Sequence, residues 1–463
     1  MPPRFFQFLL PVFCIPTVAL AVATAQDEAS FAKQIFPILT AKCQGCHLPS
    51  LRSGGMLVTS FSEFKKGGRK GPSFVPGKPD ESVVIKHLSG ALEPRMPMGM
   101  DPLAAAEIEL FRRWILEGGK DDTASGDGDP IPTSAPVYQA SPVITALAYS
   151  PDGAILAVSG NHEILLHRTD GSGIAGRLVG RAERIQSLAF SKDGKILVAV
   201  GGSPARFGEV QFWDVGNAKQ LRSIKLGSDT LLSVSFSPDD KYLAVGCPDK
   251  TVRIFDAGSG EAVRKIESHE DWVFGTVFSV DGKRLVSVSR DHFVKLSEVA
   301  TGSFLENLNL LTKATFGGHG ELYCVARHPK SDVVVAAGDD RTPRMYTMHR
   351  PRAMKIDDDS CLLREFPIQA GPVQCARFSP DGLRVAVGGM GDEINIYLVE
   401  NAAKVATLKG HKGGIYALDF HPAGTQLAAA GFDGLVRIYD IKSQDLLKDF
   451  IPVPIAAGSA SSR

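Results

Sequence analysis

The sequence predicts a multidomain protein, in which a small all-α domain is followed by an all-β propeller of seven blades. Helical periodicity is concentrated before residue 122. A Ser-Pro-Asp-Gly turn, with variations, then recurs seven times between residues 150 and 424, at intervals of 41 to 51 residues. Repeats of about this length with four strands each are typical of propeller blades. High counts of glycine (47) and proline (29) also favour a turn-rich β architecture.

The composition excludes several classes of protein. The 463 residues are 44% hydrophobic and 22% charged, as in ordinary globular domains. Basic and acidic residues balance at 51 each, so we expect no nucleic-acid partner, because such proteins usually carry a basic domain. Seven cysteines are too few for a disulfide scaffold of this size.

Residues 1–25 have the pattern of a signal peptide. Arg4 is followed by an almost wholly apolar run over residues 5–22 and then by Ala-Thr-Ala. This pattern predicts cleavage before Gln26, although an uncleaved anchor helix is the alternative. No later segment is apolar enough to cross a bilayer, so we expect no membrane span after cleavage. The mature protein should be periplasmic or extracellular.

Residues 26–122 contain a haem-attachment motif. Cys43, Cys46 and His47 form C-x-x-C-H, in which two thiols can bond one haem covalently and the histidine can bind its iron. A redox dithiol is the alternative, but it usually lies in a strand–helix unit. A zinc site would need two more ligands at suitable spacing. The motif therefore predicts one covalent haem c.

Two amphipathic helices are expected around this motif. Residues 29–41 carry one apolar stripe, and a second helix should begin with Asp101 as its N-cap and end at Gly118. A basic run at residues 65–70 is interpreted as a solvated loop. We predict the buried face of the second helix to comprise Leu103, Ile108, Phe111, Trp114 and Ile115.

The sixth iron ligand should come from a methionine-rich loop. Met96, Met98 and Met100 follow His47 by about fifty residues, in a segment rich in proline and glycine. A Met/His pair raises the haem potential and favours electron transfer. His87 is the competing ligand.

Residues 31–119 resemble the planctomycete-type cytochrome c domain. In that family the methionine of the Met-Pro pair is the axial ligand, which implies Met96 here. Met98 stands where the family usually has another residue type, and it remains the alternative ligand. The resemblance is carried by Ile35-x-Pro37-Ile38-Leu39, Cys43-x-x-Cys46-His47, Gly54-Gly55-Met56-Leu57, Gly67-Gly68, Pro76-Gly77-Lys78-Pro79-Asp80-Glu81-Ser82, Met96-Pro97 and Glu107-Ile108-x-x-Phe111-x-x-Trp114-Ile115.

The remaining chain divides into three parts. Residues 123–137 are polar and rich in glycine and proline, which predicts a flexible linker. Residues 138–452 hold the repeats, and residues 453–463 are expected to be a disordered tail.

The repeats resemble the WD40 family. In the third repeat, the sequence predicts strands at 231–236, 242–246, 251–256 and 261–266. The WD dipeptide is present once and in two aromatic variants. Three histidines precede an aspartate by 21 or 22 residues, which in this family indicates a structural hydrogen bond rather than catalysis. The dipeptides are Trp213-Asp214, Phe255-Asp256 and Tyr439-Asp440, and the His/Asp pairs are His269/Asp291, His319/Asp340 and His411/Asp433.

These features favour an electron-transfer protein whose haem domain exchanges single electrons while the propeller docks a protein redox partner. One alternative is an interaction scaffold in which the haem is a redox sensor or a structural plug. Another is a propeller enzyme that feeds electrons to the haem. No non-repeating cluster of catalytic side chains occurs in the repeats, so an electron carrier or binding protein is expected rather than an enzyme.

Overall fold

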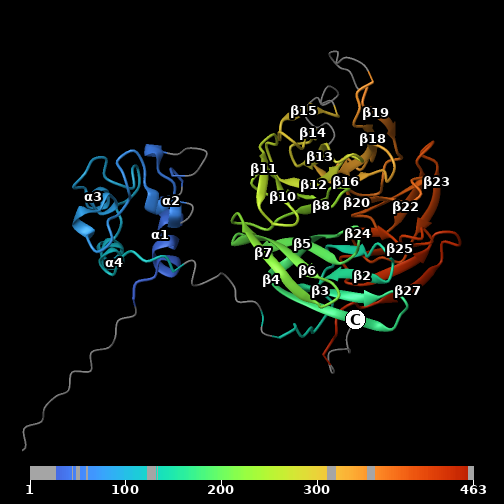
Figure 1. Cartoon of the computed structure of the whole chain (residues 1–463), viewed down its shortest axis with the longest axis horizontal. Helices are drawn as coiled ribbons and strands as arrows, with labels where there is room; N and C mark the ends of the chain where they lie inside the picture. The colour runs from blue at the N-terminus through green and yellow to red at the C-terminus, as the bar shows by residue number, and fades with distance from the viewer. Residues whose placement is uncertain are drawn as a thin grey trace, which may run out of the picture. The chain divides into compact units, whose positions relative to one another are not determined.

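The computed structural model describes residues 28–43, 45–47, 53–58, 61–122, 132, 134–309, 320–351 and 360–456. The chain divides into two compact units, Met1–Gly128 and Asp129–Arg463, which we call the helical unit and the sheet unit (Figure 1). The predicted signal peptide at residues 1–25 lies outside the described residues, as does most of the predicted linker at 123–137.

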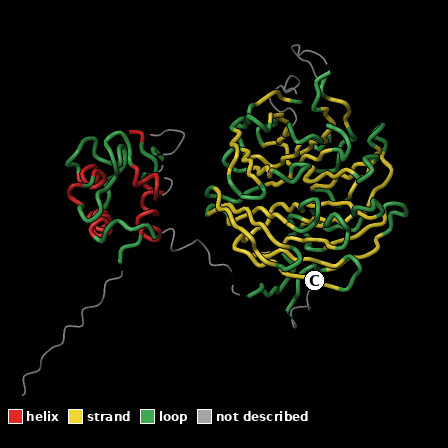
Figure 2. The backbone as a smooth tube through the Cα atoms, viewed as in Figure 1, coloured by secondary structure: helices red, strands yellow, loops and turns green. Residues whose placement is uncertain are grey.

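The regular elements of the helical unit, in its described part, are short helices (Figure 2). Its β pairing there is an isolated bridge between Gly68 and Gly71. The elements are a π-helical turn η1 (Phe31–Ile35), α1 (Phe36–Lys42), a 3₁₀ turn η2 (Ser53–Gly55), α2 (Phe61–Lys66), a 3₁₀ turn η3 (Pro79–Glu81), α3 (Val83–Ser89) and α4 (Ala105–Leu116).

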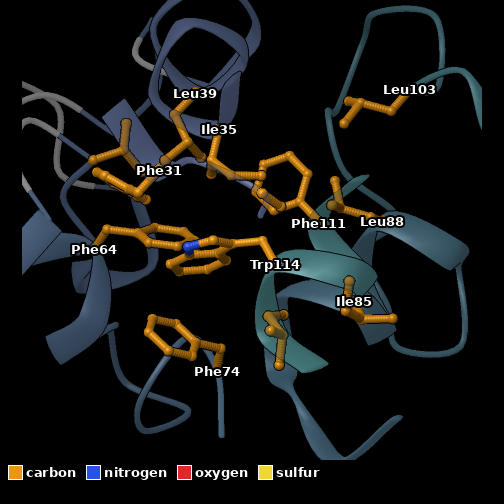
Figure 3. Packing of buried hydrophobic residues seen from close by; sticks show 13 residues of the cluster. Phe31, Ile35, Leu39, Phe64, Phe74, Ile85, Leu88, Leu103, Phe111 and Trp114 are labelled. Atoms are coloured by element: carbon orange, nitrogen blue, oxygen red, sulfur yellow. The ribbon is translucent and has the colours of Figure 1, made fainter. Parts of the chain in front are cut away.

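An aromatic cluster forms the core of the helical unit (Figure 3). The Phe31 ring packs edge-on against Phe61 at 5.0 Å between centroids and lies 5.4 Å from Trp114. Phe74 meets the opposite side of Trp114 at 4.7 Å. Such tilted and edge-on pairs are favoured geometries for aromatic rings. The unit thus has a protein core of its own, built from both predicted amphipathic segments.

Helix α4 begins later than predicted. The sequence placed its N-cap at Asp101, but Asp101 is exposed and the helix starts at Ala105. The Glu107 carboxylate accepts the backbone N–H of Ala104 at 2.8 Å, so a side chain inside the helix caps its first turn. Leu103 is buried, and Ala104 after it has an extended backbone and is the N-cap of the helix.

The sheet unit is all β in its described part and consists of six antiparallel sheets. One sheet has seven strands, in the order β1 to β7, and five have four. The strands are β1 (Leu147–Tyr149), β2 (Ile155–Ser159), β3 (Asn161–Arg168), β4 (Gly173–Phe190), β5 (Ile196–Ser203), β6 (Phe207–Asp214), β7 (Lys219–Leu226); β8 (Ser233–Phe236), β9 (Tyr242–Gly246), β10 (Val252–Asp256), β11 (Ala262–Ile266); β12 (Val273–Phe278), β13 (Arg284–Ser289), β14 (Val294–Glu298), β15 (Phe304–Asn307); β16 (Leu322–Arg327), β17 (Val333–Gly338), β18 (Arg344–Thr347), β19 (Leu362–Glu365); β20 (Val373–Phe378), β21 (Arg384–Gly389), β22 (Ile394–Leu398), β23 (Lys404–Leu408); β24 (Ile415–Phe420), β25 (Gln426–Gly431), β26 (Val436–Asp440) and β27 (Leu446–Phe450).

Strand β4 explains the seven-stranded sheet. Its first half pairs with β3, and its second half, from Arg184 to Phe190, pairs with β5. The innermost strands also contact one another in a closed order, from β1 through β4, β8, β12, β16, β20 and β24 back to β1. A cavity of about 730 Å³ is lined by residues of all these strands.

The recurring Ser-Pro-Asp-Gly turn has a local physical cause. In the third repeat the Ser237 hydroxyl donates to the Asp239 carboxylate at 2.6 Å and accepts the backbone N–H of Tyr242 at 2.9 Å. The serine side chain therefore closes the turn between two strands, as small polar residues often do. Where histidine replaces serine, as at His421, its Nε2 donates to the carbonyl of Gly153 at 3.2 Å.

The two ends of the sheet unit meet. Tyr138 forms a parallel bridge with Ile455, and its hydroxyl donates to Glu163 at 2.8 Å. Val453 is buried, and the backbone N–H of Ala456 donates to the carbonyl of Tyr138 at 2.9 Å. Residues 453–456 thus pack on the first sheet, although the sequence placed them in a disordered tail. The rest of that segment, 457–463, lies outside the described residues.

Candidate haem-attachment site

The C-x-x-C-H motif extends the end of helix α1. The backbone N–H of Cys43 donates to the carbonyl of Leu39 at 2.9 Å, which continues the helical pattern. The N–H groups of Cys46 and His47 then both donate to the Cys43 carbonyl, at 3.3 and 3.2 Å. The helix therefore presents both cysteines and the histidine on one tight turn.

The two motif cysteines are free thiols in different environments. Cys43 is half-buried and Cys46 is exposed. Burial raises the pKa of the Cys43 thiol to about 11. A catalytic dithiol needs the opposite, a lowered pKa that supplies a thiolate near neutral pH. The motif also lies at a helix end and not in a strand–helix unit, which disfavours the alternative of a redox dithiol.

A short loop fixes the second half of the motif. The N–H of Ser53 donates to the Cys46 carbonyl at 3.1 Å, and the N–H of Val58 donates to the His47 carbonyl at 3.2 Å. The Nδ1 atom of His47 is buried and has no hydrogen-bond partner among the described residues. A buried polar atom without a partner is costly, so this imidazole is poised for an interaction that the described residues do not supply.

The three methionines of the second loop differ in burial. Met96 is half-buried and packs against the same apolar cluster as Cys43. Met98 and Met100 have 61% and 57% of their surface exposed. Of the three sulfur atoms, only that of Met96 thus belongs to a side chain that packs on the motif's cluster. Met98, which the sequence leaves as the alternative ligand, is exposed and does not belong to this cluster.

His87 holds this methionine loop. Its carbonyl accepts the N–H of Met96 at 3.0 Å, and its Nδ1 donates to the carbonyl of Pro94 at 2.8 Å. Its Nε2 lies 3.5 Å from the Lys70 ammonium. The ring of the competing ligand is therefore engaged in positioning the loop that carries Met96.

These residues fit a covalent haem. Two free thiols and a histidine on one turn, with a half-buried thioether nearby in the same cluster, are the donor set of a c-type haem. An apolar macrocycle also needs apolar side chains to cover it. Partly exposed apolar residues pack with Cys43 and Met96 around the core, namely Phe36, Ile38, Met56, Phe61, Val84, Ile108 and Leu110.

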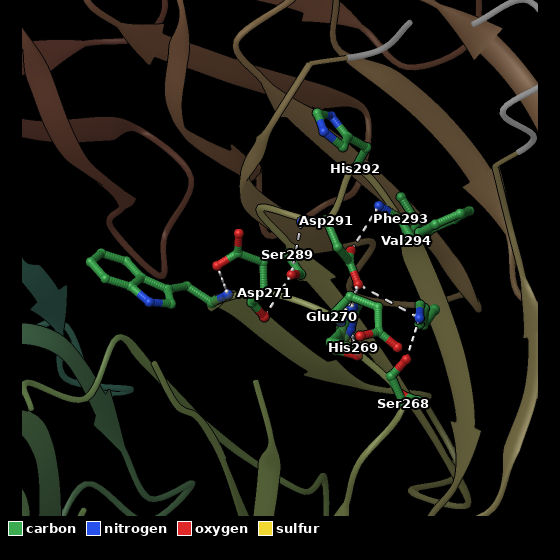
Figure 4. A network of polar contacts seen from close by, with 12 residues as sticks. Ser268, His269, Glu270, Asp271, Ser289, Asp291, His292, Phe293 and Val294 are labelled. Atoms are coloured by element: carbon green, nitrogen blue, oxygen red, sulfur yellow. Dashed lines mark hydrogen bonds and ion pairs between the residues drawn. The ribbon is translucent and has the colours of Figure 1, made fainter. Parts of the chain in front are cut away.

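One of the three predicted His/Asp pairs, His269 with Asp291, is formed in the described part of the sheet unit (Figure 4). His269 Nδ1 binds the Asp291 carboxylate at 2.8 Å, and its Nε2 lies 2.7 Å from the Ser287 hydroxyl. Burial opposes ionisation of Asp291, but the hydrogen bond and charge of His269 outweigh it and lower the pKa of Asp291 to about 2. Ser287 and His269 are 2% and 5% exposed, so no substrate can reach this Ser-His-Asp arrangement. It ties a loop to a strand.

The pair at His411 and Asp433 is not formed, and that prediction was wrong. Arg437 lies between them, 2.7 Å from the Asp433 carboxylate and 3.2 Å from His411 Nδ1. The third pair cannot be compared, because His319 lies outside the described residues; Asp340 pairs with Arg344.

Sequence reasoning missed a second kind of ion pair, which these aspartates form and which Asp249 forms as well. A basic residue follows each aspartate by four positions along the next strand, and a spacing search for Asp-x-x-x-Lys/Arg could have found it. The pairs are Asp249–Arg253 at 2.7 Å, Asp291–Lys295 at 3.6 Å, Asp340–Arg344 and Asp433–Arg437 at 2.7 Å.

Comparison with protein families agrees with both predicted resemblances. Residues 43–97 match the family model Planctomycete cytochrome C. Residues 218–256, 260–296, 311–347 and 402–440 match the WD domain, G-beta repeat. Residues 147–234 match the anaphase-promoting complex subunit 4 WD40 domain. The chain is therefore a WD40-repeat protein with a cytochrome c-like domain.

Several curated relatives are similar to short stretches of the chain. WD repeat-containing protein 1 from Gallus gallus is 38% identical over 81 residues, which are 17% of this chain and 13% of that protein. Pre-mRNA-processing factor 19 homolog 2 from Arabidopsis thaliana is 30% identical over 132 residues, or 28% of this chain and 23% of that protein. Actin-interacting protein 1 from Drosophila melanogaster is 33% identical over 81 residues, with coverages of 17% and 13%. The chain thus spans less than a quarter of these relatives.

No helix in the described part of the chain is long and apolar enough to cross a membrane.

Proposed function

We propose that the chain is a secreted or periplasmic c-type cytochrome that transfers single electrons, and that its sheet unit docks a protein partner. The observation that carries this proposal is the single turn that holds two free thiols and His47, whose buried Nδ1 has no hydrogen-bond partner within the described part of the chain. The match to planctomycete cytochrome C, which includes all of these residues, supports it.

Each residue of the site has a role in this proposal. Cys43 and Cys46 would hold one haem through thioether bonds, and His47 and Met96 would bind its iron. Bound there, the haem supplies a one-electron iron couple. The loop at 53–58 fixes the histidine by its backbone, and His87 fixes the methionine by a backbone and a side-chain hydrogen bond. Fixed ligands reduce reorganisation on electron transfer, since neither loop has to move.

We propose that the sheet unit is a seven-bladed propeller. The shared strand β4 lets the seven-stranded sheet count as two blades, because its two halves serve an outer and an inner position. The closed order of contacts among the innermost strands supports this count. WD40 repeats commonly form binding platforms, which makes protein docking the role that best suits the unit.

The proposal includes export. A covalent c-type haem is attached outside the cytoplasm, and residues 1–25 have the pattern of a cleaved signal peptide. The haem motif and the signal pattern thus point to the same compartment.

A redox titration of the purified full-length protein tests the electron-transfer role. We expect one reversible one-electron transition in the haem absorption bands. Stopped-flow reduction by periplasmic fractions should then be faster for the full chain than for residues 26–122 alone, if the sheet unit docks the donor. Equal rates would remove that docking role. Turnover of a small substrate by the full chain would instead favour an enzyme, and redox-dependent partner binding without net electron flow would favour a sensor.

A further inference from the structure

A cavity of about 510 Å³ lies where the first and last sheets of the sheet unit pack together. Residues of β1 to β4 line one side of it, and residues of β25 to β27 line the other. The segment 451–454 completes the lining, and His167 holds this segment because its Nε2 donates to the Pro452 carbonyl at 2.9 Å. Cavities of this size commonly hold small-molecule ligands. We call it the seam cavity.

The strand register explains why space is left at this seam. His167 pairs with the second residue of β2, which is the register that Trp213 of the WD dipeptide has in its own repeat. At the same position, five of the six other repeats have a large aromatic side chain that packs against the repeat before it, and the sixth has Ser297. An imidazole ring is smaller than an indole, phenol or phenyl ring, so His167 leaves room between the two sheets. The five aromatic residues are Trp213, Phe255, Tyr346, Tyr397 and Tyr439.

The charged residues that line the seam cavity are cations. Arg168 takes the place of the acidic residue that follows the aromatic position in four of the other repeats, and Lys448 lies on the opposite side, on β27. No carboxylate is among the described residues that line the cavity. Across the part of the chain that the structure describes, neither Arg168 nor Lys448 forms an ion pair. The cavity therefore attracts an anion. The four acidic residues at the position of Arg168 are Asp214, Asp256, Glu298 and Asp440.

Three acidic residues nearby do not cancel this charge. Asp170 lies near Arg168 and offsets part of its charge, so Lys448 is the stronger anchor for an anion. Asp449 follows Lys448 but lies near the aromatic residue of β26 that packs on the preceding repeat. Asp419 accepts a backbone N–H of β1 at 2.8 Å and pairs with an arginine of β20 at 3.8 Å. An uncompensated positive charge thus remains at Lys448.

The walls of the seam cavity are mostly apolar. Leu156, Ile438 and Phe450 line it, and the Lys448 ammonium lies 4.9 Å from the centre of the Phe450 ring. Burial, reinforced by the charge of Lys448, lowers the pKa of His167, so this ring adds no positive charge near neutral pH. Exposed apolar side chains at a cavity also mark a place where a ligand can bind. Those that line this cavity are Ile174, Leu447 and Ile451.

We propose that the seam cavity binds a small carboxylic acid with an apolar body. The carboxylate pairs with the Lys448 ammonium, and the apolar chain or ring lies against Leu156 and Phe450. The Tyr149 hydroxyl and the Gln426 amide also line the cavity and make no hydrogen bond among the described residues, so they are available to the ligand. A single uncompensated cation among apolar walls matches a monoanion. The site shares no residue with the candidate haem site, so this inference is independent of the proposed electron transfer.

Calorimetric titration of the full-length protein with sodium octanoate tests this proposal. We expect octanoate to bind at one site per chain. 1-Octanol and octylammonium have the same chain without the negative charge, and they should bind at least about tenfold more weakly. Absence of octanoate binding would overturn the proposal. Equal affinity for octanoate and octanol would also overturn it, because it would show an apolar surface without an anchor for the carboxylate.

Three variants locate the bound acid. Lys448→Gln removes the anchor, so octanoate should bind roughly three- to tenfold more weakly while octanol binding stays unchanged. Lys404→Gln removes the same charge from an exposed position on β23, outside the seam cavity, and should bind octanoate as the wild type does. His167→Tyr fills the cavity with the ring that Tyr439 supplies in its own repeat, and it should abolish binding of both ligands; circular dichroism checks that it folds. If Lys448→Gln binds octanoate as tightly as Lys404→Gln does, the proposal is wrong, whether or not His167→Tyr folds.

Discussion

Replacing His87 tests whether the protein positions Met96 as an iron ligand. The substitution His87→Ala removes the hydrogen bond from Nδ1 to the Pro94 carbonyl, which is 2.8 Å long. It leaves the backbone bond from Met96 to the carbonyl of residue 87 in place. The perturbation thus removes one hydrogen bond that holds the methionine loop without altering either proposed ligand.

The size of the effect follows from this single hydrogen bond. A typical intramolecular hydrogen bond contributes about 0.5–1.5 kcal/mol net, and His87 is only partly buried, so about 1 kcal/mol is expected. Since 1.4 kcal/mol corresponds to a factor of ten, the fraction of molecules with the loop released should rise about fivefold.

Competition by free imidazole measures this change. Imidazole binds the iron only when the methionine leaves, so its apparent affinity for the oxidised protein should rise about fivefold in His87→Ala. The Asn side chain in His87→Asn can donate a similar hydrogen bond, so the imidazole affinity of this variant should stay close to that of the wild type. No change in His87→Ala would refute the positioning role. Loss of the sulfur-to-iron absorption band in Met98→Ala but not in Met96→Ala would show that Met98, and not Met96, binds the iron.

Three further predictions concern the ligand, the core and pH. Met96→Ala should abolish the sulfur-to-iron charge-transfer band of the oxidised protein while Met98→Ala keeps it, and absorption spectroscopy decides. Phe31→Ala should destabilise the helical unit by about 3–5 kcal/mol in urea unfolding, because Phe31 is fully buried among aromatic rings; a loss under about 1 kcal/mol would contradict the packing. Burial and the adjacent Arg437 lower the pKa of His411 to about 4 from 6.5, so the unfolded state binds this proton more readily. The sheet unit should therefore lose about 2 kcal/mol of stability between about pH 7 and about pH 5 through this group, and His411→Gln should remove that part of the slope of stability against pH.

The sequence predicted the strands of the repeats well where the hydrophobic periodicity and the turn residues indicated the same boundaries. In the third repeat the predicted strand 242–246 is β9, and the predicted outer strand 261–266 differs from β11 by one residue. The turns were readable because a serine side chain closes five of the seven, and a histidine takes its place in the other two. The long β4 was not predicted, because a continuous strand whose two halves pair with β3 and β5 has no turn signal at its middle.

Helix starts and side-chain pairings were harder to predict. Glu107 and Asp101 are both plausible N-terminal acids, and only the packing of Leu103 decides where α4 begins. Likewise, the partner of Asp433 depends on whether a histidine or an arginine side chain lies within hydrogen-bonding distance of its carboxylate. Arg437 does so because it lies on the adjoining strand, four residues along. Spacing alone does not resolve such competition.

The haem motif was readable because covalent attachment constrains residue type and spacing together. The sequence could not decide among the three methionines, since all lie within five residues in a loop without periodicity. The structure separates them by burial, with Met96 on the apolar cluster and the other two exposed.

Intact-mass spectrometry of the denatured protein, purified from its native compartment, tests the central claim most directly. We predict a single species whose mass equals that of residues 26–463 plus one haem. Cys43→Ala combined with Cys46→Ala should remove the haem mass and leave the mature chain. A wild-type chain that carries no haem after denaturation would contradict the account.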